Sequence, residues 1–408
     1  MRYKALFRRI VVAALSTFLS STAISQKGPK DEFHFPKLHE IEMPEVETVV
    51  LDNGMKLFLV EDHRYPTIEL QAMIHVGSIY EPPDKVGLAS IVGTVMRTGG
   101  TETRPGDQLD EELERLAATV ETGIGLNSGY AYVSVLKEDI DKGLDILADV
   151  LMNPAFPEDK IELAKIQERT SIARRNDEPM AISYREFAKL IYGPRSPYAR
   201  HTEYRTIDKI AREDLVAFHR KYFHPNNILL AAWGDFEAED MVEKIERAFE
   251  GWELAEIGFP PKPEVEYEYR YTVNLIRKEE VNQSTISIGH IGGLMDNPDY
   301  PALVVMNRIL SFDRLFKRVR TAEGLAYHIS GYYGANYDYP GIFQVVCETK
   351  SESTVRAIRI ILEEIGKMTQ EEVTDEELEK AKDSFLNSWV FNFDSKAKIV
   401  RRLMTYEY

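Results

Sequence analysis

The sequence has one cysteine, few histidines and fewer basic than acidic residues. Its 408 residues include a single cysteine and nine histidines, and no pair of histidines has a convincing metal-ligand spacing. One cysteine cannot form a disulfide within one molecule, so the fold must rely on hydrophobic cores. Lysine and arginine number 50 against 67 acidic residues, giving a net charge of -17. This charge opposes a phosphate backbone and argues against nucleic-acid binding.

Beyond the first 25 residues the sequence has no apolar run long enough to span a membrane. Residues 1–25 have the layout of a secretory signal peptide: a basic start, an apolar run over 10–19, and the small-x-small triplet Ala23-Ile24-Ser25. We therefore predict export to the bacterial periplasm or out of the cell, with no membrane anchor after cleavage. A polar N-terminal arm is expected over residues 26–45.

Hydrophobic periodicity predicts an α+β fold from residue 46 onward. Asn53-Gly54 favours a hairpin turn, and apolar residues alternate over 68–76 as in a half-buried strand. Helices are expected over 86–96, 108–118 and 158–175, and strands over 119–136 and 227–233. Cys347 lies in the apolar stretch 342–347, so a buried strand position is favoured over a nucleophile.

The second half of the sequence repeats the first. Residues 74–78 are echoed at 289–293, an offset of 215, and residues 158–165 are echoed at 375–382, an offset of 217. Such a repeat predicts two domains of one fold. We expect a first domain over 46–250, a Pro-rich linker over 251–271, and a second domain over 272–408. The first copy runs about 60 residues past the point that matches residue 408, so we expect the second domain to be truncated at its C-terminus.

Several short phrases together resemble the insulinase/pitrilysin family of zinc metallopeptidases, most closely its mitochondrial-processing-peptidase-like branch. The resemblance covers residues 46–408 and implies tandem α+β domains in a clamshell arrangement, each a mostly antiparallel sheet with helices on one face. The phrases that carry it are Pro82–Ala89, Gly99–Arg104, Tyr222–Asn227, Arg314–Phe316 and Gly324–Tyr327.

The zinc motif of the active family members is missing here. Those members carry His-x-x-Glu-His on the helix after Gly-Leu-Ala, where two histidines hold zinc and the glutamate acts as general base. The matching positions are Ser90, Gly93 and Thr94, and the position of a further, distant glutamate ligand falls on Ser171. By this resemblance the chain binds no zinc or other cofactor, and zinc is expected in a partner subunit.

A second-domain pair of the family is retained. The resemblance assigns Arg320 and Tyr327 the role of reaching a bound peptide near its scissile carbonyl. The alternative is an arginine on a solvated surface and a tyrosine packed on the sheet. The family's glycine-rich turn before Arg-Leu-Phe is replaced by the shorter, glycine-free Leu310–Asp313.

Three interpretations of function follow. The first is a non-catalytic subunit, contributing Arg320 and Tyr327, of a heterodimeric zinc peptidase that acts on extended or unfolded peptides. Its partners would be a homologous zinc-motif-bearing chain and the peptide. The second is a peptide-binding or scaffold clamshell without a role in proteolysis. The third is an active metalloendopeptidase with an unrecognised metal site. We do not expect peptidase activity from this chain alone.

Overall fold

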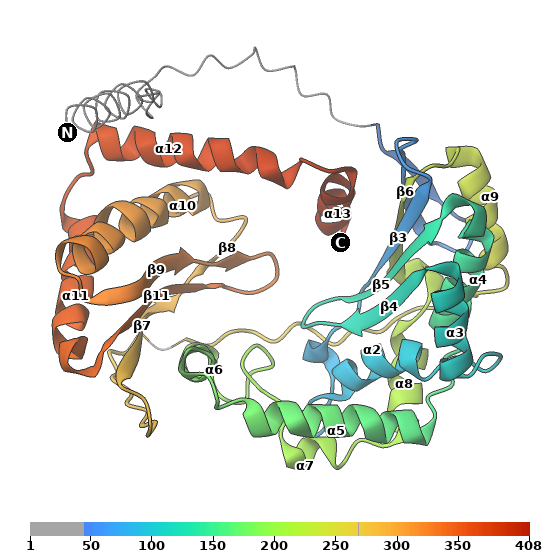
Figure 1. Ribbon diagram of the computed structural model, residues 1–408, viewed down its shortest axis with the longest axis horizontal. Helices are drawn as coiled ribbons and strands as arrows, with labels where there is room; N and C mark the ends of the chain where they lie inside the picture. The colour runs from blue at the N-terminus through green and yellow to red at the C-terminus, as the bar shows by residue number, and fades with distance from the viewer. Residues whose placement is uncertain (1–44, 268) are drawn as a thin grey trace, which may run out of the picture. The chain divides into compact units, whose positions relative to one another are not determined.

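The computed structural model describes residues 45–267 and 269–408. The predicted signal peptide and all but the last residue of the predicted arm lie outside this range. Within it, no helix has the length and apolar composition that a membrane span requires. The chain forms two successive α+β halves, as the repeat predicts (Figure 1).

The first half carries a six-stranded sheet in the order β1-β2-β6-β3-β5-β4, in which only β2 and β6 run parallel. The predicted hairpin turn is present, with Gly54 at a positive φ of 86° and the Asn53 side chain accepting a hydrogen bond from the Met55 amide at 3.1 Å. The strands are β1 (Glu47–Val50), β2 (Lys56–Glu61), β3 (Thr67–Ile74), β4 (Thr119–Ile124), β5 (Gly129–Leu136) and β6 (Ile228–Gly234).

The helices of the first half fall close to their predicted ranges. Its second helix begins two residues earlier than expected, at Gly106, directly after Pro105, which suits a helix N-terminus. The helices are α2 (Leu88–Thr98), α3 (Gly106–Leu116), α4 (Ile140–Met152), α5 (Glu158–Arg174), α6 (Pro179–Tyr192), α7 (Tyr204–Ile207), α8 (Arg212–Tyr222) and α9 (Ala238–Ala248).

The second half repeats part of this arrangement around a three-stranded antiparallel sheet in the order β7-β11-β9. Cys347 is fully buried in β11, and burial raises the pKa of its thiol to about 11, which fits a packing role. The elements are β7 (Gln283–Ile291), β8 (Gly293–Leu294), α10 (Tyr300–Arg308), a π-helix η4 (Ile309–Ala322), β9 (Ala326–Tyr333), β10 (Ala335–Asn336), β11 (Ile342–Lys350), α11 (Thr354–Gln370), α12 (Asp375–Trp389) and α13 (Lys396–Glu407).

Each sheet is covered on one face by helices of its own half and on the other by a helix of the other half. Along β2, Leu57 and Leu59 belong to the core beneath the first half's helices, whereas Phe58 and Val60 pack against Val400 and Met404 of α13. Reciprocally, α6 packs against β7, where the Ser183 and Ser287 hydroxyls are hydrogen-bonded at 2.7 Å. This exchange ties the halves together.

The connection between the halves contains no helix or strand among its described residues. Tyr198 of the first half contacts this connection, since its hydroxyl donates to the Pro263 carbonyl at 3.1 Å. Residues 271–276 lie at the repeat offset from β2, yet they pair with no strand in the part of the chain that the structure describes. Their apolar side chains Val273 and Leu275 are exposed. In the first half, β6 fills the place between β2 and β3.

Candidate functional site

The N-terminus of α2, where the zinc-motif helix would start, is held by the buried carboxylate of Glu81. Its Oε2 accepts hydrogen bonds from the amides of Gly87 at 3.2 Å and Ala89 at 3.0 Å, and its side chain contacts Arg200 at 4.0 Å. Gly87 has a φ of 108°, a conformation that favours glycine. Burial raises the pKa of Glu81 to about 7, despite the opposing hydrogen bonds from the helix N-terminus.

We expect Glu81 to make stability depend on pH. A pKa raised from 4.5 to about 7 means that the neutral carboxyl stabilises the fold below pH 4.5 and that this stability is lost as pH rises through 7. Glu81→Gln keeps an acceptor but does not ionise. Between pH 5 and 8.5 the wild type should lose roughly 2 to 3 kcal/mol of unfolding free energy relative to this variant. Urea unfolding of both proteins across this range tests the prediction, and parallel curves would refute it.

The four positions that match the lost zinc set lie on α2 and α5. The hydroxyl of Ser90 donates to Glu168 of α5 at 2.7 Å. Ser171 is exposed, and its hydroxyl donates to the Gln167 carbonyl at 3.1 Å within its own helix. The α5 residue that the structure brings to the zinc-motif helix is therefore Glu168. The sequence argument did not consider Glu168, because the family spacing points to Ser171, about one helical turn later.

The place of the general base is filled by protein backbone. A Cβ atom on Gly93 would lie 2.5 Å from the amide nitrogen of Ile124 and within 2.9 Å of Gly123, both in β4. The Thr122 hydroxyl also donates to the Gly93 carbonyl at 2.6 Å, which fixes α2 against this strand. No side chain fits at Gly93 unless α2 and β4 move apart. The residues present therefore do not fit a zinc ion with its ligands and base.

Thr94 supplies no alternative ligand set. Its carbonyl accepts a hydrogen bond from the Thr98 hydroxyl at 3.0 Å, and its side chain is half-buried. Across residues 45–267 and 269–408, no three His, Cys, Asp or Glu side chains are grouped so that they could hold a metal ion.

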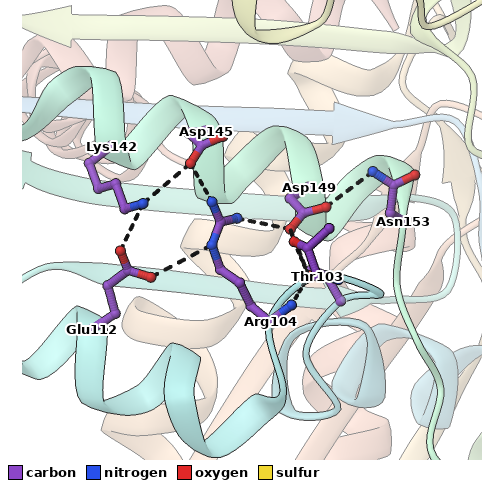
Figure 2. Close-up of polar contacts among 8 residues, drawn as sticks. Thr103, Arg104, Glu112, Lys142, Asp145, Asp149 and Asn153 are labelled. Atoms are coloured by element: carbon purple, nitrogen blue, oxygen red, sulfur yellow. Dashed lines mark hydrogen bonds and ion pairs between the residues drawn. The ribbon is translucent and has the colours of Figure 1, made fainter.

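The phrase Gly99–Arg104 forms a loop that is bound to α4 by a polar network (Figure 2). Asp149, which is 9% exposed, accepts hydrogen bonds from the hydroxyls of Thr101 at 2.6 Å and Thr103 at 2.7 Å and from Arg104 at 2.8 Å. Burial raises the pKa of Asp149, but these hydrogen bonds outweigh it and the pKa is lowered. These contacts thus anchor the loop that follows α2 to α4.

The structure brings Arg320 and Tyr327 together at the start of β9. The Arg320 guanidinium lies 5.3 Å from the Tyr327 ring centroid and 4.9 Å from that of Phe316. In the pairing of β9 with β11, Thr349 faces Ala326 and Glu348 faces His328, so Tyr327 is the extra residue of a β-bulge. A bulge changes the direction of a side chain, and Tyr327 is 82% exposed. The pair therefore lies on the surface, and its tyrosine does not pack on the sheet.

Leu310–Asp313 is not a turn. These residues belong to η4, which continues α10 directly and in which the backbone bonds follow the wider π pattern. Runs of π-helix longer than one turn are rare. Two contacts hold it: Ser311 accepts a hydrogen bond from the Gly331 amide at 3.0 Å, and Arg314 pairs with Glu377 at 2.9 Å. Without a glycine in this stretch, the helix is not interrupted.

Comparison with known proteins identifies the family. The model described as "Insulinase (Peptidase family M16)" matches residues 56–190, and that described as "Peptidase M16 inactive domain" matches residues 209–385. The chain belongs to the insulinase/pitrilysin (M16) peptidase family. An uncharacterized zinc protease of Rickettsia felis is 26% identical, over 81% of this chain and 80% of that protein.

Two further relatives are named as parts of multi-chain proteins. The probable mitochondrial-processing peptidase subunit beta of Arabidopsis thaliana is 23% identical, covering 90% of this chain and 72% of its own. Subunit 1 of the human mitochondrial cytochrome b-c1 complex is 25% identical, covering 66% of this chain and 56% of its own.

Among solved structures, a protease from Helicobacter pylori has a TM-score of 0.76 at 18% identity, covering 89% of each chain.

Proposed function

We propose that this chain is the non-catalytic subunit of a heterodimeric zinc peptidase, to which it contributes Arg320 and Tyr327. The metal and the general base would come from a homologous partner with an intact His-x-x-Glu-His helix. The substrate would be an extended or unfolded peptide. The signal-peptide-like residues 1–25 support a heterodimer outside the cytoplasm, in the periplasm or secreted.

One contrast carries the proposal. On α2 there is no room for the zinc ligands and the general base, whereas in the second half Arg320 and Tyr327 lie next to each other. Backbone fills the general-base position at Gly93, and Ser90 is bonded to Glu168. In the second half, Arg320 and Tyr327 lie side by side on the surface. An arginine and a tyrosine side by side on the surface are donors that can reach the carbonyl of a bound peptide, which supports a role in peptide handling.

A scaffold without a role in proteolysis is the second candidate. The similarity to subunit 1 of the cytochrome b-c1 complex supports it, as does the replacement of a glycine-rich turn by η4. A helical segment at this place reduces the freedom of the backbone in front of Arg320. An active peptidase with an unrecognised metal site is the third candidate, and it would require stoichiometric zinc in the purified chain.

The test is peptidase activity on a quenched, unstructured peptide. The full-length mature protein is assayed alone and mixed with any homologue that carries His-x-x-Glu-His and is encoded by a neighbouring gene. We expect activity only in the mixture, and a fall of about 100-fold with Arg320→Ala or Tyr327→Phe, as for loss of one transition-state donor. Arg356→Gln, which removes another exposed arginine of the same half, is the matched control and should leave the rate unchanged.

Each other outcome selects another candidate. Activity of this chain alone, abolished by a chelator, would establish a metal site of its own. A mixture whose activity does not respond to Arg320→Ala would remove the pair from catalysis. Peptide binding without activity in any combination would favour the scaffold.

A further inference from the structure

Arg320 differs from the other cations of its helix in having aromatic rings, and no carboxylate, as neighbours. Across residues 45–267 and 269–408, its guanidinium forms no ion pair and no hydrogen bond. The other three basic residues of η4 each contact acidic side chains: Arg314 with Glu377, Lys317 with Asp313, and Arg318 with Glu323, Glu363 and Glu364. In a chain with 67 acidic residues, one exposed arginine thus keeps its full charge and all its N–H donors.

Two rings contact this guanidinium and hold it in a different way from a carboxylate. Its central carbon lies 4.9 Å from the ring centroid of Phe316 and 5.3 Å from that of Tyr327. A ring attracts a cation through its π electrons, so the charge is not neutralised and no N–H donor is bound to an anion. A carboxylate would occupy two N–H donors and cancel charge that stabilises a developing oxyanion.

The two rings differ in how firmly they are held. Phe316 is half-buried and directly follows Leu315, which is fully buried in the core of the second half. Tyr327 is exposed on its bulge, and in the described part of the chain its side chain forms no hydrogen bond and no ring contact other than that with Arg320. The fixed ring is therefore Phe316, which supports Arg320, and Arg320 in turn supports Tyr327.

We propose that Phe316 is a positioning residue of this site, whose ring fixes the Arg320 guanidinium and leaves its charge and its N–H donors for the carbonyl of a bound peptide. The inference rests on the function proposed above and adds a residue to it. A long arginine side chain that is not held samples many rotamers, and loss of orientation lowers the rate even when the group itself is present. Phe316 acts through Arg320 and does not have to touch the peptide.

The first experiment measures kcat and KM of the full-length mature chain, mixed with a partner that carries His-x-x-Glu-His, on the quenched peptide. Phe316→Leu removes the ring but keeps an apolar side chain. It should lower kcat about tenfold and leave KM unchanged, because a transition-state donor loses its orientation. With Arg320→Ala already present, Phe316→Leu should cause no further fall, because it acts only through the arginine. Phe316→Trp should retain the rate, since tryptophan is the best ring for a cation–π contact.

Two further variants separate the ring from other ways of holding the arginine. Phe316→Glu places a carboxylate where it can pair with Arg320 and neutralise it, so kcat should fall to about the level of Arg320→Ala. Phe312→Leu is the matched control, because Phe312 is an exposed phenylalanine of the same helix that contacts no cation in the described structure. Its replacement should leave kcat unchanged. A wild-type rate with Phe316→Glu would overturn the requirement for a ring.

A second readout needs neither a partner nor activity. Urea unfolding of this chain alone is measured for Phe316→Leu, Arg320→Ala and the double variant. The cycle should show a coupling of about threefold in the unfolding equilibrium constant, as expected for an exposed cation–π contact. The same cycle with Phe312→Leu in place of Phe316→Leu should show no coupling.

These results decide the inference independently of the proposed function. Additive losses in the Phe316 cycle, or a kcat that Phe316→Leu leaves unchanged in an active mixture, would overturn it. A further fall in kcat from Phe316→Leu in the absence of Arg320 would also overturn it, since the ring would then act on the fold in general. Coupling in a chain that activates no partner supports the positioning of Arg320 and removes the peptidase subunit. Partner-dependent activity without coupling leaves the subunit and removes the role of Phe316.

Discussion

Restoring the zinc motif by Ser90→His, Gly93→Glu and Thr94→His should produce no zinc site and should destabilise the first half. The substitution at Gly93 is decisive, because any Cβ there meets the backbone of β4 at 2.5 Å. Backbone cannot rotate away as a side chain can, so α2 and β4 must separate. Gly93→Ala alone should lower the free energy of unfolding by about 3 kcal/mol. Denaturant unfolding measures this loss, and metal analysis after dialysis measures zinc.

A glycine in another helix is the matched control. Gly366 lies in α11, and a Cβ atom there would have nothing within 4 Å. Gly366→Ala should be neutral or should stabilise by up to about 1 kcal/mol, because alanine is the better helix former. Stoichiometric zinc in the triple variant, with an unchanged unfolding midpoint, would show that the helix and strand separate readily. The zinc site would then be lost through its ligands alone.

Much of the fold could be predicted because it depends on local patterns. The alternation over β3, the Asn53-Gly54 turn and the proline before α3 each determine a nearby backbone conformation. The repeat offset predicted the succession of elements in the second half. The exchange of α6 and α13 between the sheets could not be predicted, because an amphipathic helix does not specify which sheet it covers.

The candidate site could be predicted from the sequence only in part, for the same reason. Spacing relative to a family motif selected Ser90, Gly93, Thr94 and Ser171, and it gave no indication of Glu168, which accepts a hydrogen bond from Ser90. Glu168 lies about one helical turn before Ser171, and the packing of α5 against α2 brings it to Ser90. The buried Glu81 could have been suspected, since an acidic residue shortly before a helix often binds its free amides. The bulge at Tyr327 and the π-helix depend on tertiary contacts, and no local sequence pattern signals them.

The polar loop after α2 stabilises the fold in a different way from the close packing at Gly93. Its contribution to the free energy of unfolding depends on one buried charge. Arg104 contacts Asp149 at 2.8 Å and also Asp145 and Glu112, and Figure 2 shows these carboxylates around its guanidinium. Asp149 is the buried member, whereas the Asp145 side chain is 54% exposed. The two aspartates of α4 therefore offer a comparison of buried and exposed partners of one arginine.

Asp149→Ala should lower the free energy of unfolding by about 3 kcal/mol, because it leaves the Thr101 and Thr103 hydroxyls and part of Arg104 without their acceptor. Asp145→Ala should cost less than about 1 kcal/mol, since solvent replaces an exposed partner. The lowered pKa of Asp149 means that its contribution is present above the unfolded-state pKa of 3.8 and is lost as pH falls through the folded-state value. The two variants should therefore differ at pH 7 and converge in strong acid. Urea unfolding of both variants at pH 7 and in strong acid measures this difference. Equal losses at pH 7 would show that the loop does not depend on the buried carboxylate.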